Sequence, residues 1–110
     1  MDCICKMLRK DIVRRYALID EKEEIGHVYL YLIENDLHDK PYGLIEDLFI
    51  IEEKRGWGLG KELMRHIIEE AREIGCYKLI ATSRDEKERV HKFYKELGFK
   101  EWGREFRIDF

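Results

Sequence analysis

The stretch "EEKRGWGLGKELM", residues 52–64, places three glycines at alternate positions directly before an apolar helical pattern. The whole chain contains only eight glycines. Glycine is unfavourable inside a helix or strand, but it is favourable where a backbone turns sharply or approaches a ligand closely. We therefore predict a tight loop at Gly56, Gly58 and Gly60 that leads into a helix.

The residues before this loop predict three strands. Three segments rich in Val, Ile, Leu, Tyr and Phe are separated by polar residues, which is typical of consecutive antiparallel strands. They are "KDIVRRYALID" (10–20), "GHVYLYLIEN" (26–35) and "YGLIEDLFII" (42–51). The second segment is apolar at nearly every position, which predicts a strand covered on both faces and therefore a central sheet with helices against it.

The residues after the loop predict two helices and two more strands. Apolar residues recur every three or four positions over 63–74 and again over 90–97, and a glycine follows each run. A short strand at 77–83 lies between them, and "REFRIDF" (104–110) alternates apolar and charged residues like a strand with one covered face. Residues 1–110 are expected to form a single α/β domain with a mixed sheet, because a strand–helix–strand passage favours a parallel neighbour.

Composition restricts the class of protein. The net charge of −3 gives no basic field for nucleic acid, and no long apolar run predicts a membrane span or a secretion signal. Cys3, Cys5 and Cys76 lack zinc-like spacing, so we expect free thiols in a reducing cytoplasm and no metal. The chain has no Gln and a single Asn beside abundant Glu, Lys and Arg, which is the trend of hyperthermophile proteins.

The glycine loop is a candidate anion site. A loop that enters a helix N-terminus presents unpaired N–H groups and the positive end of the helix dipole, which together bind phosphate. The Walker pattern fails, because Gly56 to Gly60 is one residue short and Lys61 is followed by Glu62 instead of a hydroxyl residue. The dinucleotide pattern G-x-G-x-x-G also fails, because the glycines follow G-x-G-x-G. A nucleotide-binding regulator is therefore disfavoured, and a plain glycine turn is the remaining alternative.

A third pattern fits. Arg55-x-x-Gly58-x-Gly60, after an apolar strand and at the start of an amphipathic helix, resembles the pyrophosphate loop of the GNAT superfamily of acyl-CoA N-acyltransferases. "LFIIEEKRGWGLGKELM" (48–64) resembles the family's fourth strand, loop and third helix, and "HKFYKELGF" (91–99) resembles its tyrosine-bearing helix. The resemblance extends over residues 27–110. It implies a mainly antiparallel sheet with splayed central strands and two main helices, with acetyl-CoA as cosubstrate and direct transfer without a metal.

The resemblance also implies which residues bind the coenzyme. Backbone N–H groups of residues 55–60 would hold the pyrophosphate, and backbone groups of the strand before the loop would pair with the pantetheine arm. Lys87 stands where the family often has a coenzyme-contacting Asn, and a lysine there is expected to reach phosphate instead. The implied coenzyme-binding residues are Leu48, Ile50, Arg55, Gly56, Trp57, Gly58, Leu59, Gly60, Lys61 and Lys87.

Two catalytic residues follow from the same comparison. Glu46 lies where many family members carry a glutamate that takes the amine proton. Desolvation inside an apolar strand should raise its pKa, as suits a base, whereas an exposed edge carboxylate is the alternative. Asp47 points to the opposite face if the strand is regular, and a bulge would change that. Tyr94 resembles the general acid toward the coenzyme A thiolate, with packing in its apolar helix stripe as the alternative. His66 and His91 are expected to be structural.

The acceptor side departs from the family pattern. Members usually carry a helical segment between their first two strands, but residues 1–20 have room only for one strand running into the next. A compact chain of this kind leaves the acceptor cleft open to a large amine or to completion by a second subunit. Together with the amphipathic segment 104–110, this predicts a homodimer.

The acceptor itself stays open. "GLIEDLFI" (43–50) and "GCYKLI" (75–80) resemble glucosamine-6-phosphate N-acetyltransferases. The missing helical segment and Asp109 in the predicted last strand argue against a sugar phosphate. The sequence therefore predicts a cytoplasmic, acetyl-CoA-dependent N-acetyltransferase that acts on a primary amine in a small molecule or a protein. The alternative is a non-catalytic coenzyme A-binding or interaction module with the same fold.

Overall fold

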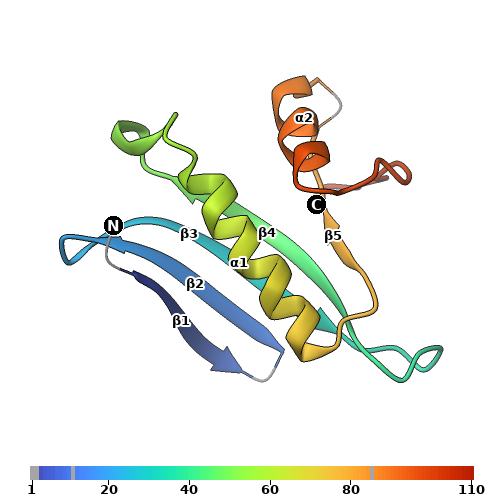
Figure 1. Cartoon of the computed structure of the whole chain (residues 1–110). Coiled ribbons are helices and arrows are strands. Elements are labelled where there is room, and N and C mark those ends of the chain that lie inside the picture. Colours follow the sequence, from blue (N-terminus) through green and yellow to red (C-terminus); the bar gives the residue numbers. More distant parts are fainter. Residues whose placement is uncertain (1–2, 11, 85) are drawn as a thin grey trace.

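The computed structural model describes residues 3–10, 12–84 and 86–110. Its elements alternate as the sequence predicts, with a strand-rich N-terminal half followed by helix, strand and helix (Figure 1). In chain order they are β1 (Cys3–Lys10), β2 (Val13–Asp20), β3 (Glu23–Ile33), β4 (Tyr42–Ile50), the 3-10 turn η1 (Glu52–Lys54), α1 (Leu59–Ile74), β5 (Leu79–Ala81) and α2 (Glu88–Glu96). None of the helices in these ranges is long and apolar enough to cross a membrane.

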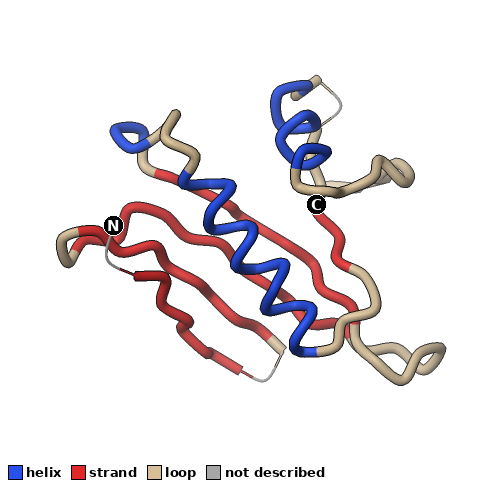
Figure 2. The backbone as a smooth tube through the Cα atoms, in the orientation of Figure 1, coloured by secondary structure: helices blue, strands red, loops and turns tan. Residues whose placement is uncertain are grey.

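The strands form one sheet in the order β1-β2-β3-β4-β5 (Figure 2). The first four strands are antiparallel neighbours, whereas β4 and β5 are parallel and are connected through α1. This confirms the predicted mixed, mainly antiparallel sheet. β1 ends at Lys10 and β2 begins at Val13, so these two strands follow one another directly as the sequence indicates.

β5 pairs with only the first part of β4. The register pairs are Gly43↔Leu79, Leu44↔Ile80 and Ile45↔Ala81, so among the described residues the second half of β4 has no strand neighbour on that side. Figure 1 shows the two strands diverging from their shared end. A Cβ atom added at Gly43 would lie 2.7 Å from Leu79 Cδ1 and 2.9 Å from Leu30 Cδ1, so a larger residue here would force these two side-chain ends to move. The predicted splay is therefore present.

α1 covers one face of the sheet and completes the core. Its buried residues are Leu63, Met64, Ile67 and Ala71, which is the stripe that the sequence predicts. They pack with Tyr16, Val28, Leu30 and Ile45 of three successive strands. Tyr16 is fully buried and its hydroxyl donates a hydrogen bond of 3.1 Å to Glu70 on α1. Burial raises the pKa of Tyr16 to about 12, and the charge of Glu70 acts in the same direction.

The face opposite α1 is more open than the sequence suggests. Along β3, Val28 and Leu30 are buried against the core, whereas His27, Tyr29 and Tyr31 alternate with them and are only half-buried. The prediction of a strand covered on both faces is therefore wrong. The rings of Tyr29 and Tyr31 stack on one another, with centroids 6.2 Å apart. In a hydrophobicity pattern these rings count as apolar, so half-buried tyrosines are easily taken for core residues.

The predicted last strand is also wrong. Residues 99–110 form no strand, and Phe106, Ile108 and Phe110 are almost fully exposed. Alternation predicts which residues would share a face, but a strand forms only where a neighbouring edge supplies hydrogen bonds. Asp109 is bonded to Arg107 in this exposed segment, with Nε and Oδ1 2.8 Å apart. The argument against a sugar phosphate from Asp109 in a last strand therefore fails.

Candidate functional site

The glycine loop is a tight turn that opens α1. Gly56 and Gly58 have φ angles of +85° and +78°, the left-handed conformation that favours glycine. Gly58 is the residue that precedes the helix, and its carbonyl accepts the N–H of Glu62 at 3.1 Å. Arg55 closes the turn from the other side, because its Nε donates to the carbonyl of Ile50 at 2.8 Å. The loop therefore returns directly to the end of β4.

The loop is suited to an anion. Among the described residues, the N–H groups of residues 56–61 form no backbone hydrogen bond, and no side chain caps the helix. Positions where a Cβ would stand on Gly56 and Gly58 have no atom within 4 Å, so the backbone is open to a ligand. Free N–H groups at the positive end of a sixteen-residue helix attract a phosphate group. The chemistry of these donors fits a pyrophosphate.

The charged residues near the loop are already engaged with protein groups. The guanidinium of Arg55 lies over the ring of Phe49, 5.4 Å from its centroid. Lys61 Nζ lies 3.1 Å from Glu96 Oε1 and so connects the first turn of α1 to α2. Lys87 precedes the first turn of α2, and its exposed side chain forms no ion pair within the described ranges. Any phosphate contact from Lys61 competes with Glu96.

The end of β4 meets both helices at the loop. A Cβ on Gly60 would lie 3.6 Å from Phe93 of α2 and 3.9 Å from Ile50 of β4, so three elements converge here. Leu48 and Ile50 are half-buried against the core, and β5 does not pair with this part of β4. The remaining loop residues of the predicted site differ in exposure, with Trp57 77% exposed and Leu59 half-buried.

Tyr94 of α2 is affected by the charge of Glu46 on β4. Tyr94 is half-buried between Phe93 and Phe99, with both ring centroids 5.3 Å away. Burial raises the pKa of Tyr94, and the negative charge of Glu46 raises it further, so the phenol stays protonated at neutral pH. Glu46 itself is exposed, so the apolar surroundings that the sequence suggests for it are not those it has. The structure thus places a protonated phenol on α2 within the electrostatic influence of a carboxylate on β4.

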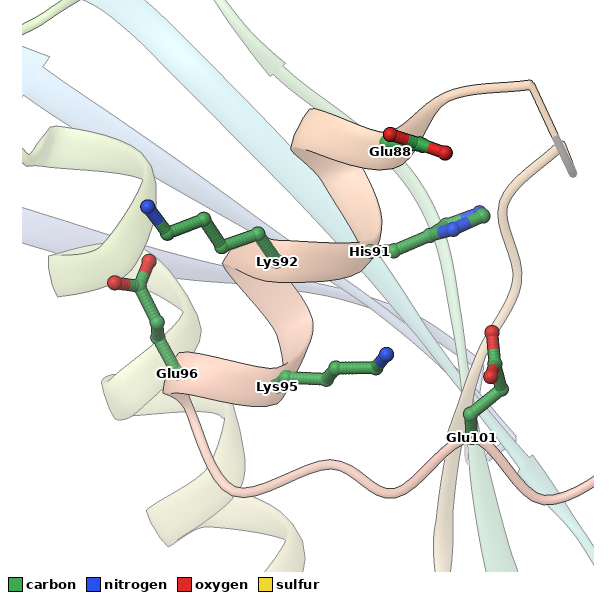
Figure 3. A pocket seen from close by; sticks show the side chains of 6 residues that line it. All are labelled: Glu88, His91, Lys92, Lys95, Glu96 and Glu101. Carbon is green, nitrogen blue, oxygen red and sulfur yellow. The ribbon is translucent and has the colours of Figure 1, made fainter.

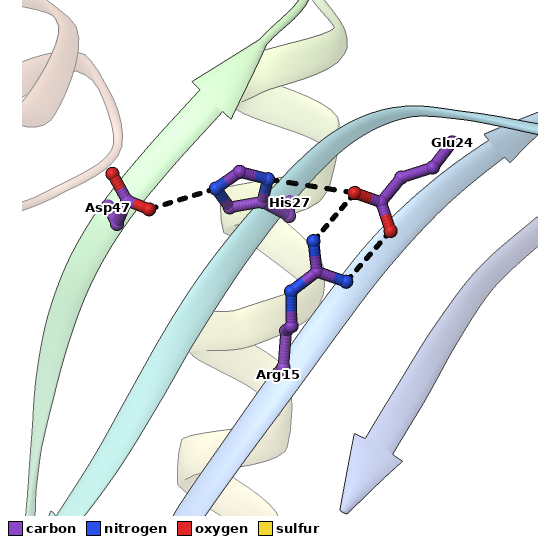
Figure 4. Close-up of polar contacts among 4 residues, drawn as sticks. All are labelled: Arg15, Glu24, His27 and Asp47. Atoms are coloured by element: carbon purple, nitrogen blue, oxygen red, sulfur yellow. Dashed lines mark hydrogen bonds and ion pairs between the residues drawn. The ribbon is translucent and has the colours of Figure 1, made fainter.

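A β-bulge separates Glu46 from the end of its strand. Tyr29 pairs with Glu46 and His27 pairs with Phe49, so β4 holds one more residue than β3 over this stretch. Asp47 is the residue with left-handed geometry, at φ +56°. Its Oδ2 lies 3.0 Å from His27 Nε2, on the face opposite α1 (Figure 4). The regular-strand arrangement considered for Asp47 is therefore replaced by the bulge.

The chain matches a known protein family over most of its length. The family model described as Acetyltransferase (GNAT) family matches residues 2–99. The chain belongs to this family. A solved structure, an acetyltransferase of Trypanosoma brucei, superposes on this GNAT chain with a TM-score of 0.80 and 29% sequence identity. The match covers 89% of this chain and 69% of that one.

Curated relatives share the same region of this GNAT chain. The glucosamine 6-phosphate N-acetyltransferase of Trypanosoma brucei brucei is 42% identical over 67 residues, which are 61% of this chain and 44% of the relative. Glucosamine 6-phosphate N-acetyltransferase 1 of Oryza sativa subsp. japonica is 39% identical over 59 residues, 54% of this chain and 34% of the relative. The chain thus spans less than half the length of these relatives.

The histidines of the GNAT helices have structural contacts. His91 Nε2 lies 2.7 Å from the carbonyl of Arg84, and the ring of His66 contacts the edge of Tyr16. Both arrangements agree with the structural roles expected for them.

A surface hollow beside α2 is lined by charged side chains of both signs, and neither Tyr94 nor Glu46 is among them (Figure 3). Its lining residues are Glu88, His91, Lys92, Lys95, Glu96 and Glu101.

Two further observations concern possible metal ligands and the cysteines. In the described ranges, no three His, Cys, Asp or Glu side chains converge as metal ligands. Cys76 is a free thiol whose pKa is raised by burial, and the side chains of Cys3 and Cys5 lie outside the described part of the chain. His27 carries no sequence signal, because its contact with Asp47 depends on the strand register and leaves no motif.

Replacing Gly58 by Ala tests the geometry of the loop. The new Cβ meets no neighbour, so its effect comes from the left-handed backbone, and we expect the free energy of unfolding to fall by about 1 kcal/mol. Gly103→Ala is the matched control, since that position is exposed, open and without a positive φ. Urea denaturation measures both. Equal stability of the Gly58 variant and wild type would show that the turn does not require glycine at this position.

Proposed function

We propose that this protein is an acetyl-CoA-dependent N-acetyltransferase that transfers an acetyl group directly to a primary amine. The observation that carries the proposal is the open glycine loop at the start of α1, where the N–H groups of residues 56–61 form no backbone hydrogen bond within the described ranges. The loop follows the part of β4 that β5 does not pair. Family membership supports the same activity.

The residues of the proposed site form two sets, one that would bind the coenzyme and one that would take part in the reaction. The free N–H groups of residues 56–61 would hold the pyrophosphate, and the unpaired side of β4 at Leu48 would hold the pantetheine arm. The carbonyl of Ile50 is bonded to Arg55, so this acceptor is occupied by the protein itself. When bound, acetyl-CoA supplies the acetyl thioester. Trp57, Leu59 and Lys87 would make the outer contacts.

Glu46 and Tyr94 would move the two protons of the reaction. The Glu46 carboxylate takes a proton from the incoming amine, which then has a free electron pair for attack. Tyr94 stays protonated at neutral pH and so can give its proton to the departing sulfur. Because Glu46 is exposed, a water molecule is able to relay the amine proton.

The acceptor would approach the face of the sheet opposite α1. β1 follows directly into β2, and Tyr29 and Tyr31 on this face are only half-buried. Aromatic faces beside the Glu46 carboxylate suit an amine carried on a ring or a short chain. The curated relatives are named for glucosamine 6-phosphate, so this amino sugar is the first acceptor to test.

We further infer that a second copy of the chain covers segment 104–110. Phe106, Ile108 and Phe110 alternate with charged residues, and all three are exposed in the single chain. β5 is an edge strand, which leaves one row of backbone groups available for pairing. Two copies of the chain can therefore bury each other's exposed apolar row and pair with each other's free strand edge in a symmetric dimer.

Calorimetric titration with acetyl-CoA, desulfo-CoA and ATP tests the assignment of the loop. We expect both coenzyme A compounds to bind and ATP to bind at least about tenfold more weakly, because the pantetheine arm adds contacts along β4. The Gly58→Ala variant should bind both coenzyme compounds more weakly than Gly103→Ala does. Absence of binding by either coenzyme compound would overturn the proposed function.

Tyr94→Phe and Glu46→Gln test the reacting pair. Each should lower kcat by about 100-fold while the affinity for acetyl-CoA changes little, since each removes one proton-transfer group. Steady-state kinetics with glucosamine 6-phosphate, and with a panel of amines if this one is inactive, measures the effect. Tyr77→Phe is the matched control for loss of a phenol away from the site. An unchanged kcat for Tyr94→Phe would return Tyr94 to a packing role and favour the non-catalytic module.

Sedimentation equilibrium tests the second copy. The wild type is expected at twice the mass of one chain, and Ile108→Asp is expected to shift it to the single-chain mass, because a buried charge opposes association. Leu37→Asp is the control, since Leu37 is an exposed apolar residue in the loop before β4. A wild-type mass equal to one chain at micromolar concentration would contradict the proposed dimer.

A further inference from the structure

We propose that His27 is a positioning residue for the acetyl transfer, because it holds Asp47 and thereby fixes the bulge in β4 that carries Glu46. The proposal rests on the proposed function for its kinetic consequence. Its structural part concerns only how the sheet is held. His27 lies on β3 and so acts from the neighbouring strand, without contact to the reacting groups themselves.

The bulge needs an interaction to hold it. Asp47 has a φ of +56°, a conformation that non-glycine residues adopt only when their surroundings stabilise it. Its side chain is 70% exposed, so packing does not fix it. Within the described ranges, its polar contact is the 3.0 Å bond between Oδ2 and His27 Nε2. This bond joins the extra residue of β4 to the strand against which the register shifts.

His27 is itself held from several sides. Its side chain is only 19% exposed and its ring lies 5.7 Å from that of Phe49 and 5.9 Å from that of Tyr29. Its Nδ1 lies 3.8 Å from Glu24 Oε2. Arg15 donates to both oxygens of Glu24, at 2.8 and 2.6 Å, and so keeps this carboxylate in place (Figure 4). The Arg15 guanidinium also lowers the pKa of Glu24, which remains ionised at neutral pH.

The contacts form a continuous line across three strands. Arg15 on β2, Glu24 and His27 on β3, and Asp47 on β4 lie in this order on the face opposite α1. A carboxylate faces each ring nitrogen of His27, so rotation of the ring would lose one contact or both. We call these four residues the cross-strand line. It ends one residue away from Glu46.

The bulge decides which way Glu46 points. Side chains alternate between the two faces of a strand, so removal of one extra residue from the register would turn neighbouring side chains to the other face. In the observed register Glu46 pairs with Tyr29 and its charge reaches Tyr94. Weakening the bulge would separate the carboxylate from this arrangement. The binding loop, which follows η1, would stay as it is.

Variants at His27 test the proposal with two independent measurements. His27→Leu removes the donor, His27→Gln keeps an amide N–H at a similar reach, and His38→Leu makes the same change in the loop before β4. The first measurement is kcat and KM with acetyl-CoA and glucosamine 6-phosphate, or with an active amine of the panel. The second is the set of backbone amide resonances of residues 46–49 in an NMR spectrum, which does not depend on activity.

The expected pattern separates positioning from general stability. His27→Leu should lower kcat about tenfold with KM for acetyl-CoA within about twofold, because misplacing a reacting group affects turnover more than binding. The amides of residues 46–49 should shift while those of α1 do not. His27→Gln should recover most of kcat and most of the wild-type resonances, and His38→Leu should change neither.

Other outcomes overturn the proposal. Unshifted amides of residues 46–49 in His27→Leu would show that His27 does not hold the bulge. Shifted amides with an unchanged kcat would show that the bulge does not position the transfer. Equal losses of kcat in the Leu and Gln variants with unshifted amides would assign His27 a direct part in the reaction. Wild-type protein without turnover would instead refute the proposed function, and the amide shifts would still decide whether His27 holds the bulge.

Discussion

The site depends on the point where the pairing of β4 with β5 stops. Three register pairs hold the parallel strands together, and beyond Ile45 the backbone of β4 has no strand partner on that side in the part of the chain that the structure describes. Unpaired backbone groups are unfavourable unless water or a ligand satisfies them, so this stretch is the natural place for an extended ligand. The glycine loop lies at the far end of the same strand, and α2 lies beside it. The proposed binding groups thus lie along β4 and in the loop that follows η1, and the proposed reacting groups lie on β4 and α2.

The electrostatics of the site follow from this arrangement. Tyr94 is held in an apolar setting by Phe93 and Phe99, and the charge of Glu46 opposes its ionisation further. Glu46 is exposed, whereas Tyr94 is half-buried. The difference comes from their elements, since Glu46 stands on β4 next to the bulge and Tyr94 stands on the side of α2 that packs against the core. The fold thus provides an exposed carboxylate and a half-buried phenol, which are the two groups of the proposed proton transfers.

Local features of the fold were predictable, whereas features that depend on distant neighbours were not. The glycine loop and the buried stripe of α1 are set by residues close in sequence, and both are present as predicted. Covering of β3 on both faces was predicted wrongly, because half-buried tyrosines resemble core residues in a hydrophobicity pattern. The strand at 104–110 was predicted wrongly because alternation cannot supply the neighbouring edge. The bulge at Asp47 depends on His27, twenty positions earlier.

The close packing around Gly43 restricts which residues can replace it. The separation of β4 and β5 begins where Gly43 allows Leu79 and Leu30 to approach within the radius of a methyl group. A larger residue at position 43 would require the side-chain ends of Leu79 and Leu30 to move, because its Cβ atom would lie 2.7 Å and 2.9 Å from their Cδ1 atoms. The place where β4 and β5 meet is thus linked to a position that carries no side chain. Among variants of this sequence, a substitution at residue 43 is expected together with a smaller residue at 79 or 30.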